Sequence, residues 1–142
     1  MLATGNYTGC ASIGDQVSAM AKNAGVAGIV TDGMARDIKG IEEVGLPVFA
    51  RGITPNSPYG KGPGKVGYPI EAGGRAVASG DLVIGDRDGI VIVPSAQIEQ
   101  VANNLDAIRK AEKELAEKVA EGLTCFDNVR EILAGPLTVR EE

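Results

Sequence analysis

GDQVSAMAKNAGVAGIVTDGMARD, the stretch from Gly14 to Asp37, contains a helix pattern followed by a strand pattern. Apolar residues at helical spacing predict a helix over Asp15–Ala24 with one apolar face, which would include Val17 and Met20. Gly25 follows directly and is a suitable C-terminal cap, since glycine adopts the left-handed backbone that ends helices. This helix is the element around which the other predictions are arranged.

A strand, a turn and a second short helix are predicted after that first helix. The apolar run Ala27–Thr31 has the length of a strand, and an Asp-Gly pair then supplies turn residues. Arg36 and Asp37 open the second helix, Gly45 is its expected cap, and twenty residues separate Asp15 from Arg36. A helix-strand-turn path can return the Arg-Asp pair to the end of the element where Asp15 lies. Two carboxylates and one guanidinium would then lie together.

The composition excludes several classes of function. The chain has 142 residues, enough for one domain with a modest core. Its net charge is -5 and it lacks a basic cluster, which argues against a nucleic-acid partner because Lys and Arg supply most of that affinity. It contains no histidine, which excludes Ser-His and Cys-His nucleophiles and histidine-based zinc sites. A metal would need oxygen ligands, which favours Mg or Mn.

The cysteines and the N-terminal residues predict a cytoplasmic location. Cys10 and Cys125 lie far apart at no metal-ligand spacing, which is typical of free thiols in a reducing compartment. The first residues lack a basic segment of the signal-peptide kind, and no apolar run reaches membrane-spanning length. We therefore expect no membrane partner.

The middle of the chain predicts a loop and short strands. Thr54–Gly67 holds four glycines and three prolines, so it is expected to be irregular, either a functional loop or a surface excursion. Asp86–Gly89 supplies the turn of a hairpin. The expected strands are Pro47–Ala50, Val66–Ile70, Arg75–Ala78, Asp81–Gly85 and Ile90–Val93.

A long helix is predicted over Ser95–Glu121, with Ser95 as its cap and Gly122 as its stop. Its apolar residues recur at alternating spacings of three and four, but Glu112 stands where that pattern requires an apolar residue. A carboxylate in an apolar seam is costly unless it is paired or used. Residues 1–122 are expected to form one β/β/α domain that includes this helix, and residues 123–142 a short helix and tail.

Four blocks in order carry a family resemblance. They are Asp15 with Arg36-Asp37 at their spacing, VAGIVTDGMARD, LPVFARGITP from Leu46, and SGDLVIGDRDGIVIVP from Ser79. Together they resemble the class II pyruvate aldolases acting on 4-hydroxy-4-methyl-2-oxoglutarate. Those enzymes share their fold with the regulator of ribonuclease activity A and with proteins labelled demethylmenaquinone methyltransferases. The resemblance runs from about Ala3 to about Gly122, whereas family members usually carry several tens of residues before this point.

The resemblance implies a fold and an activity. The expected fold class is α/β, a swivelling β/β/α domain of the regulator-of-ribonuclease-activity-A type, shortened at its N-terminus. The expected activity is that of a lyase, a metal-dependent aldolase that cleaves 4-hydroxy-2-oxo acids to pyruvate. Decarboxylation of oxaloacetate is also implied, because both reactions pass through the same enolate. A non-catalytic regulator that binds a ribonuclease or another protein, and a defunct enzyme, stay as alternatives.

The resemblance also assigns roles to residues. Asp37 would be the ligand of Mg or Mn, Arg36 would neutralise the enolate, and Asp15 would orient a water molecule on the cation. The substrate keto acid would bind Arg36 and the helix start at Gly14, Asp15, Gln16 and Val17, where free N–H groups favour an anion. The plainer interpretations are a helix cap at Asp15 and a surface ion pair at Arg36-Asp37. Many such aldolases carry Asp or Glu three residues after Asp37, where this chain has Gly40.

Assembly is the last expectation. The resembling aldolases are trimers or pairs of trimers in which the next chain donates a glutamate, so a homotrimer or homohexamer is expected. Glu112 is the predicted donor and third catalytic residue, with Glu114 as the fallback. The plainer interpretation is that Glu112 faces solvent.

Overall fold

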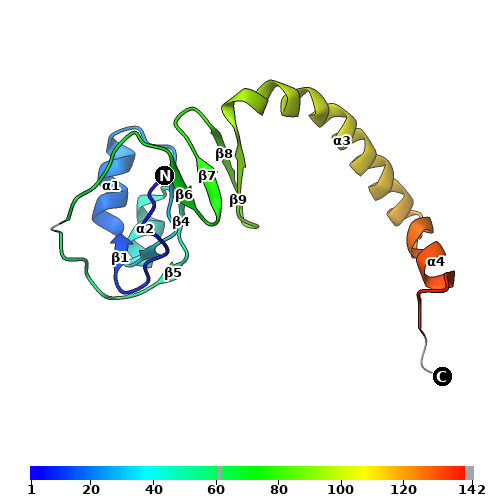
Figure 1. Ribbon diagram of the computed structural model, residues 1–142, viewed down its shortest axis with the longest axis horizontal. Coiled ribbons are helices and arrows are strands. Elements are labelled where there is room, and N and C mark those ends of the chain that lie inside the picture. The colour runs from blue at the N-terminus through cyan, green and yellow to red at the C-terminus, as the bar shows by residue number, and fades with distance from the viewer. Residues whose placement is uncertain (61, 140–142) are drawn as a thin grey trace. The chain divides into compact units, whose positions relative to one another are not determined.

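The structure is a computed structural model that describes residues 1–60 and 62–139. Its described residues divide into two compact units, one ending at Ile98 and one beginning at Glu99. The first unit holds all the described strands and two helices, and the second holds most of one long helix and a short one (Figure 1). Within the described residues no helix is both long and apolar enough to cross a bilayer.

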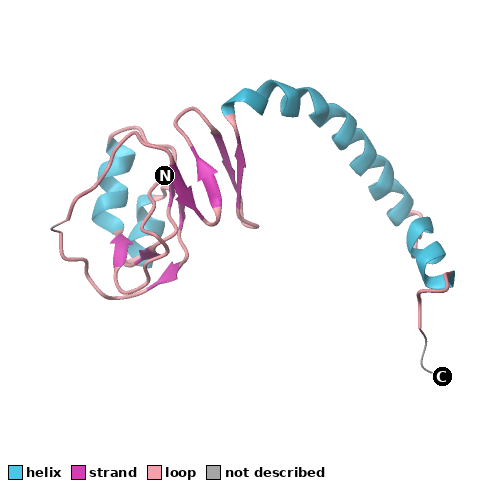
Figure 2. Cartoon of the chain, in the orientation of Figure 1, coloured by secondary structure: helices cyan, strands magenta, loops and turns pink. Residues whose placement is uncertain are grey.

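Short parallel strands form the centre of the first unit (Figure 2). β1, β3 and β5 make a parallel three-stranded sheet, β2 and β4 make a parallel pair, and Leu2 bridges to Thr31 beside that pair. The bounds of these elements are β1 Ala11–Ile13, α1 Asp15–Asn23, β2 Ile29–Val30, β3 Met34–Ala35, α2 Ile38–Val44, β4 Val48–Phe49 and β5 Gly52–Ile53.

Two antiparallel hairpins and the helical unit follow. β6 pairs with β7, and β8 pairs with β9 through the turn predicted at Asp86–Gly89. The predicted strand Val66–Ile70 begins four residues too early. The bounds are β6 Ile70–Ala72, β7 Arg75–Val77, β8 Leu82–Gly85, β9 Ile90–Val93, a 3-10 turn Ser95–Gln97, α3 Ile98–Ala120 and α4 Asp127–Ala134.

The main hydrophobic core lies where α1 and α2 pack against each other and against the strands. Its buried members are Ile13, Ile29, Ala35, Ile41 and Leu46. The predicted apolar face of α1 is wrong at Val17 and Met20, which are 43% and 61% exposed, whereas Ala21 packs against the core. Small side chains face the core instead, with Ser18 fully buried and bonded to the carbonyl of Gly14. Because these side chains are small, α1 can pack close to the core.

Glycines end the helices as predicted. Gly25 and Gly45 have positive φ angles, and the N–H groups at the end of α1 return to carbonyls of its last turn. Gly122 ends α3 in the same way. Ser95 is not a side-chain cap: its own N–H instead donates to the carboxylate of Asp81, which also accepts from Ala78. These two hydrogen bonds outweigh desolvation and lower the pKa of Asp81.

Asp32 ties the N-terminal loop to β2. This residue is 6% exposed, and its carboxylate accepts from the N–H and hydroxyl of Thr4 at 2.6 and 2.9 Å and from the N–H of Asn6 at 2.9 Å. Burial alone would raise the pKa of Asp32, but these hydrogen bonds outweigh it and hold the pKa below its ordinary value of 3.8. Beside it, a Cβ on Gly33 would lie 2.8 Å from Thr4, so only glycine fits there.

We expect Asp32→Asn to lower the free energy of unfolding by about 2 kcal/mol at pH 7, because an amide NH₂ would face backbone donors. Since the folded pKa is lowered, the contribution of the carboxylate is complete above pH 3.8 and is lost as the pH falls through the folded value. Urea unfolding at pH 7 and at pH 3 measures the difference. Asp88→Asn, an exposed turn residue, is the matched control. An equal difference at both pH values would contradict this account.

Candidate active site

Arg36 and Asp37 lie between the end of β3 and the start of α2. The Arg36 N–H donates to the carbonyl of Ile13 at 2.9 Å, which fixes this residue beside the end of β1. Asp37 is the N-cap of α2 and has a left-handed backbone, with φ 57° and ψ 44°. That conformation is uncommon outside glycine and is adopted most readily by Asn and Asp. The fold therefore holds Asp37 in a strained conformation at the predicted site.

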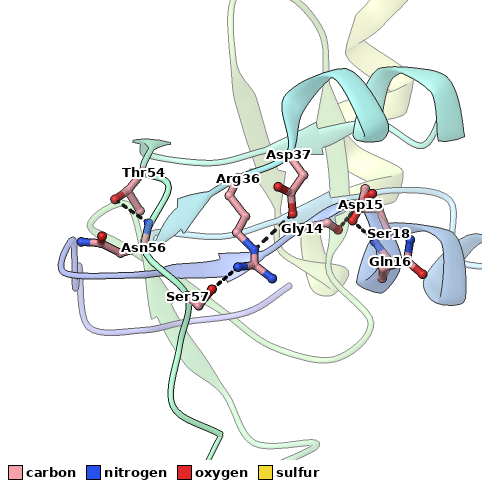
Figure 3. A network of polar contacts seen from close by, with 9 residues as sticks. All are labelled: Gly14, Asp15, Gln16, Ser18, Arg36, Asp37, Thr54, Asn56 and Ser57. Atoms are coloured by element: carbon pink, nitrogen blue, oxygen red, sulfur yellow. Dashed lines mark hydrogen bonds and ion pairs between the residues drawn. The ribbon is translucent and has the colours of Figure 1, made fainter.

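The side chain of Arg36 is held from two sides (Figure 3). Its Nε lies 3.1 Å from Oδ2 of Asp37, and its Nη1 donates to the hydroxyl of Ser57. The side chains of Arg36 and Asp37 are 36% and 44% exposed, so a small molecule can reach both. The plainer interpretation, an ion pair at the surface, describes part of this arrangement but leaves out Ser57.

Ser57 was missed in the sequence because its contact with Arg36 spans twenty-one residues. It lies in the loop predicted from Thr54, and the first residues of that loop are anchored. The side-chain amide of Asn56 donates to the carbonyl of Gly9 at 3.1 Å, and its own carbonyl accepts from Ala11 at 2.9 Å. The start of the loop is thus fixed to the N-terminal residues, and it places the hydroxyl of Ser57 against Arg36.

The predicted helix start lies beside this pair. Gly14 is the N-cap of α1, and a Cβ built on it would lie 2.8 Å from Oδ2 of Asp37. Asp15 opens α1, and its Oδ1 accepts from the N–H of Gln16 at 2.6 Å. The structure therefore brings together Gly14, Asp15, Arg36 and Asp37, as the spacing in the sequence predicts.

Two of the predicted substrate-binding residues are placed less directly. The N–H of Gln16 is engaged by the neighbouring carboxylate of Asp15, so an anion would have to displace that bond. Val17 lies in the first turn of α1 with an exposed side chain. Their roles stay predictions.

Gly40 stands where many of the resembling aldolases carry Asp or Glu, and the structure shows what its missing side chain allows. A Cβ at this position would lie 2.6 Å from Cβ and 2.8 Å from Oδ2 of Asp15, both closer than side chains tolerate. The absence of a side chain at Gly40 therefore makes room for the carboxylate of Asp15. An acidic residue there would move Asp15.

The donor set fits a hydrated hard cation. In the residues that the structure describes, no three Asp, Glu or Cys side chains converge into a metal-holding group. Magnesium usually keeps several water ligands and binds proteins through one or two carboxylates. Asp37, with Asp15 nearby, can supply that number, and water and a keto acid would complete the ligand set. Cys10 and Cys125 are free and take no part.

Glu112 lies on α3, in the second unit. It is exposed, as is nearly every residue of that helix, and the fallback residue Glu114 forms an ion pair with Lys110. Its predicted role concerns a neighbouring chain and stays a prediction.

The comparison with protein families shows to which family the chain belongs. The family model described as "RraA-like: Aldolase/RraA" matches residues 1–92. The chain belongs to this family. Its fold class is α/β of the RraA-like type, as predicted, since solved members of the RraA-like family share its arrangement of helices and strands.

Three relatives illustrate the RraA-like kinship. A Halalkalibacterium halodurans protein with a provisional 4-hydroxy-4-methyl-2-oxoglutarate aldolase name is 39% identical over 85% of this chain and 55% of its own. The Thermus thermophilus 4-hydroxy-4-methyl-2-oxoglutarate aldolase is 31% identical over 59% of this chain and 51% of its own length. The solved structure of Streptomyces coelicolor RraAS2, described as an unusual member of the RNase ES inhibitor RraA protein family, is 32% identical to this chain. The two structures superpose with a TM-score of 0.69 over 79% of this chain and 57% of RraAS2. The chain thus spans about half the length of these RraA-like relatives.

We expect Gly14→Ala to lower turnover about ten-fold in the pyruvate-release assay described under Proposed function while the protein stays folded, because a Cβ 2.8 Å from Oδ2 of Asp37 must displace that carboxylate. Steady-state kinetics and thermal unfolding measure the two effects. Gly60→Ala is the matched control, since nothing lies within 4 Å of a Cβ there. Full activity in Gly14→Ala would show that this contact does not matter.

Proposed function

We propose that this chain is a divalent-metal-dependent aldolase that cleaves 4-hydroxy-2-oxo acids to pyruvate and also decarboxylates oxaloacetate. The observation that carries the proposal is the cluster of Arg36 and Asp37 with the start of α1 at Gly14 and Asp15. The aldolase names of the RraA-like relatives support it. We place the protein in the cytoplasm, with a small keto acid as its substrate.

Arg36, Asp15 and Asp37 have different roles in the proposed cleavage. Cleavage breaks the bond between C3 and C4, the hydroxyl on C4 gives up its proton, and the electron pair passes into a pyruvate enolate. Arg36 binds that enolate with a guanidinium fixed by Asp37 and Ser57. Asp15 orients the water that receives the hydroxyl proton and returns it to C3. A cation held by Asp37 supplies, when bound, Lewis-acid polarisation of the keto oxygen.

The direct test is pyruvate release from 4-hydroxy-4-methyl-2-oxoglutarate, followed by coupled reduction of the product. Turnover is expected with Mg or Mn and is expected to disappear with a chelator. Oxaloacetate is the second substrate of the same assay. Turnover that the chelator leaves unchanged, or no pyruvate above the blank with either substrate, would overturn the proposal.

A second candidate function is a non-catalytic regulator of a ribonuclease. The likeness to RraAS2 and the net charge of -5 favour a protein-binding surface of acidic character. Inhibition of RNA cleavage by RNase ES, equally strong with wild type and with a variant that lacks the carboxylate of Asp37, would support the regulator. Pyruvate release without such inhibition would support the aldolase.

We further propose a homotrimer or homohexamer in which Glu112 reaches the site of the next subunit. The apolar seam of α3 is exposed within this chain, with Val101 at 38%, Ile108 at 51% and Val119 at 53%. Exposed apolar residues that recur along one helix favour a contact with another protein surface. A neighbouring subunit would cover the seam.

Mixing subunits tests the donated glutamate. We expect Glu112→Gln to lose turnover about a hundred-fold and to elute as the same oligomer as wild type. Mixing it with subunits that lack Asp37 is expected to restore part of the activity, because some boundaries then pair an intact Asp37 with an intact Glu112. Glu121→Gln, at the residue that follows α3, is the matched control. A fully active monomer would contradict both the oligomer and the donation.

A further inference from the structure

A cavity of ≈ 510 Å³ lies on the first unit between the N-terminal loop, the β2–β4 pair and the two hairpins. Its volume lies in the range of cavities that hold small molecules. Most of its walls are apolar, formed by Val30, Val48, Phe49, Ile90 and Ile92. None of its lining residues belongs to the Arg36–Asp37 cluster, so it is a separate place on the protein.

Charged side chains at this cavity favour an anion. Arg51 and Arg75 both line it, and Asp32 is the only acidic residue among those of its lining residues that the structure describes. Two positive charges and one negative charge leave a net charge of +1. The oxygens of Asp32 already accept three hydrogen bonds from Thr4 and Asn6, so they are committed to the protein itself. An anion entering the cavity would meet the guanidinium groups.

Arg51 is held in place at the cavity. Its Nη1 donates to the side-chain oxygen of Asn6 at 2.7 Å, and its backbone N–H donates to the carbonyl of Gly33 at 2.9 Å. Asn6 itself has a left-handed backbone with φ 61° and is fixed by Asp32 through its N–H. The buried carboxylate therefore positions Asn6, and Asn6 positions Arg51. A guanidinium fixed in this way presents its remaining N–H donors with little loss of entropy on binding.

We propose that this cavity binds a small monocarboxylate with an apolar body, the carboxylate on Arg51 and Arg75 and the body against the apolar walls. An arginine fork matches the two oxygens of a carboxylate, which gives orientation as well as affinity. The apolar walls select against small hydrophilic acids such as pyruvate. The site is independent of the proposed aldolase chemistry, because the two share no residue.

Titration with 4-phenylbutyrate tests the proposal, with 4-phenylbutan-1-ol as the uncharged ligand of the same skeleton. Calorimetry is expected to give the acid at least about ten-fold higher affinity than the alcohol, which is the usual size of a charged hydrogen-bond contribution. In amide NMR spectra the acid is expected to shift Gly73 and Gly89, which line the cavity, and to leave Gly135 unchanged.

Variants locate the binding site. Arg75 is exposed, so Arg75→Gln is expected to fold normally and to weaken the acid about ten-fold without affecting the alcohol. Arg130→Gln, on α4, is the matched control, and Arg36→Gln is expected to bind the acid as wild type does. The proposal fails if acid and alcohol bind alike, if Arg75→Gln binds like wild type, or if Arg36→Gln removes binding.

Discussion

Asp37→Asn is expected to lower turnover by about three orders of magnitude, because a hard cation loses the only carboxylate that the motif gives it directly. Asparagine suits this position better than alanine as a test. Like aspartate, it tolerates the left-handed backbone that Asp37 adopts, whereas alanine adds strain of about 1 kcal/mol. The thermal midpoint of Asp37→Asn is therefore expected to stay close to that of wild type. Asp37→Ala is expected to lose turnover as well and to melt earlier.

Asp88→Asn controls for the removal of one surface charge, since Asp88 is an exposed residue of the β8–β9 turn. It is expected to turn over like wild type. Metal binding gives a second readout: titration with Mn should show weaker binding in Asp37→Asn and unchanged binding in Asp88→Asn. Normal turnover of Asp37→Asn in the presence of Mg would remove Asp37 from the site.

Arg36→Lys is expected to lose about a hundred-fold in turnover although it keeps the charge. Arginine contacts Asp37 through Nε and Ser57 through Nη1, and a single ammonium cannot reproduce two separately placed donors. The loss should fall mainly on kcat if Arg36 acts on the enolate rather than on the bound substrate.

Added ethylguanidine tests directly whether a guanidinium group restores turnover, which the Arg36→Lys substitution alone does not test. In Arg36→Ala it is expected to restore part of the turnover, because it can occupy the space between Asp37 and Ser57. Arg87→Lys, in the β8–β9 turn, should behave like wild type. A fully active Arg36→Lys would show that the planar fork plays no part in turnover.

The sequence predicts helices and hairpins in this fold better than short central strands. Gly25, Gly45 and Gly122 mark three helix ends correctly, because left-handed caps depend on local chemistry. β3 and β5 have two residues each and are defined by their parallel partners, which no local pattern reveals. The prediction for the core-facing side of α1 was wrong at Val17 and Met20, because the closely packed core takes the small residues Ser18 and Ala21 instead.

The candidate site was predictable only in part. The sequence spacing placed Asp15 beside Arg36 and Asp37, and the structure does bring them together. The contact of Ser57 with Arg36 could not be foreseen, because it depends on where a loop rich in glycine and proline returns. The space that Gly40 leaves for Asp15 depends on the packing of α2 against α1 and is equally invisible in one sequence.

The left-handed backbone of Asp37 has an evolutionary consequence. A position that few residues tolerate can drift only toward asparagine or glycine without a folding cost. Each of these replacements needs a single base change in an aspartate codon, and each removes the carboxylate. A gene that encodes this chain can therefore lose, in one step, the carboxylate that we propose as a metal ligand and still encode a folded protein. Such a descendant remains available to selection for binding alone, which offers a short route from an enzyme to a regulator on one scaffold.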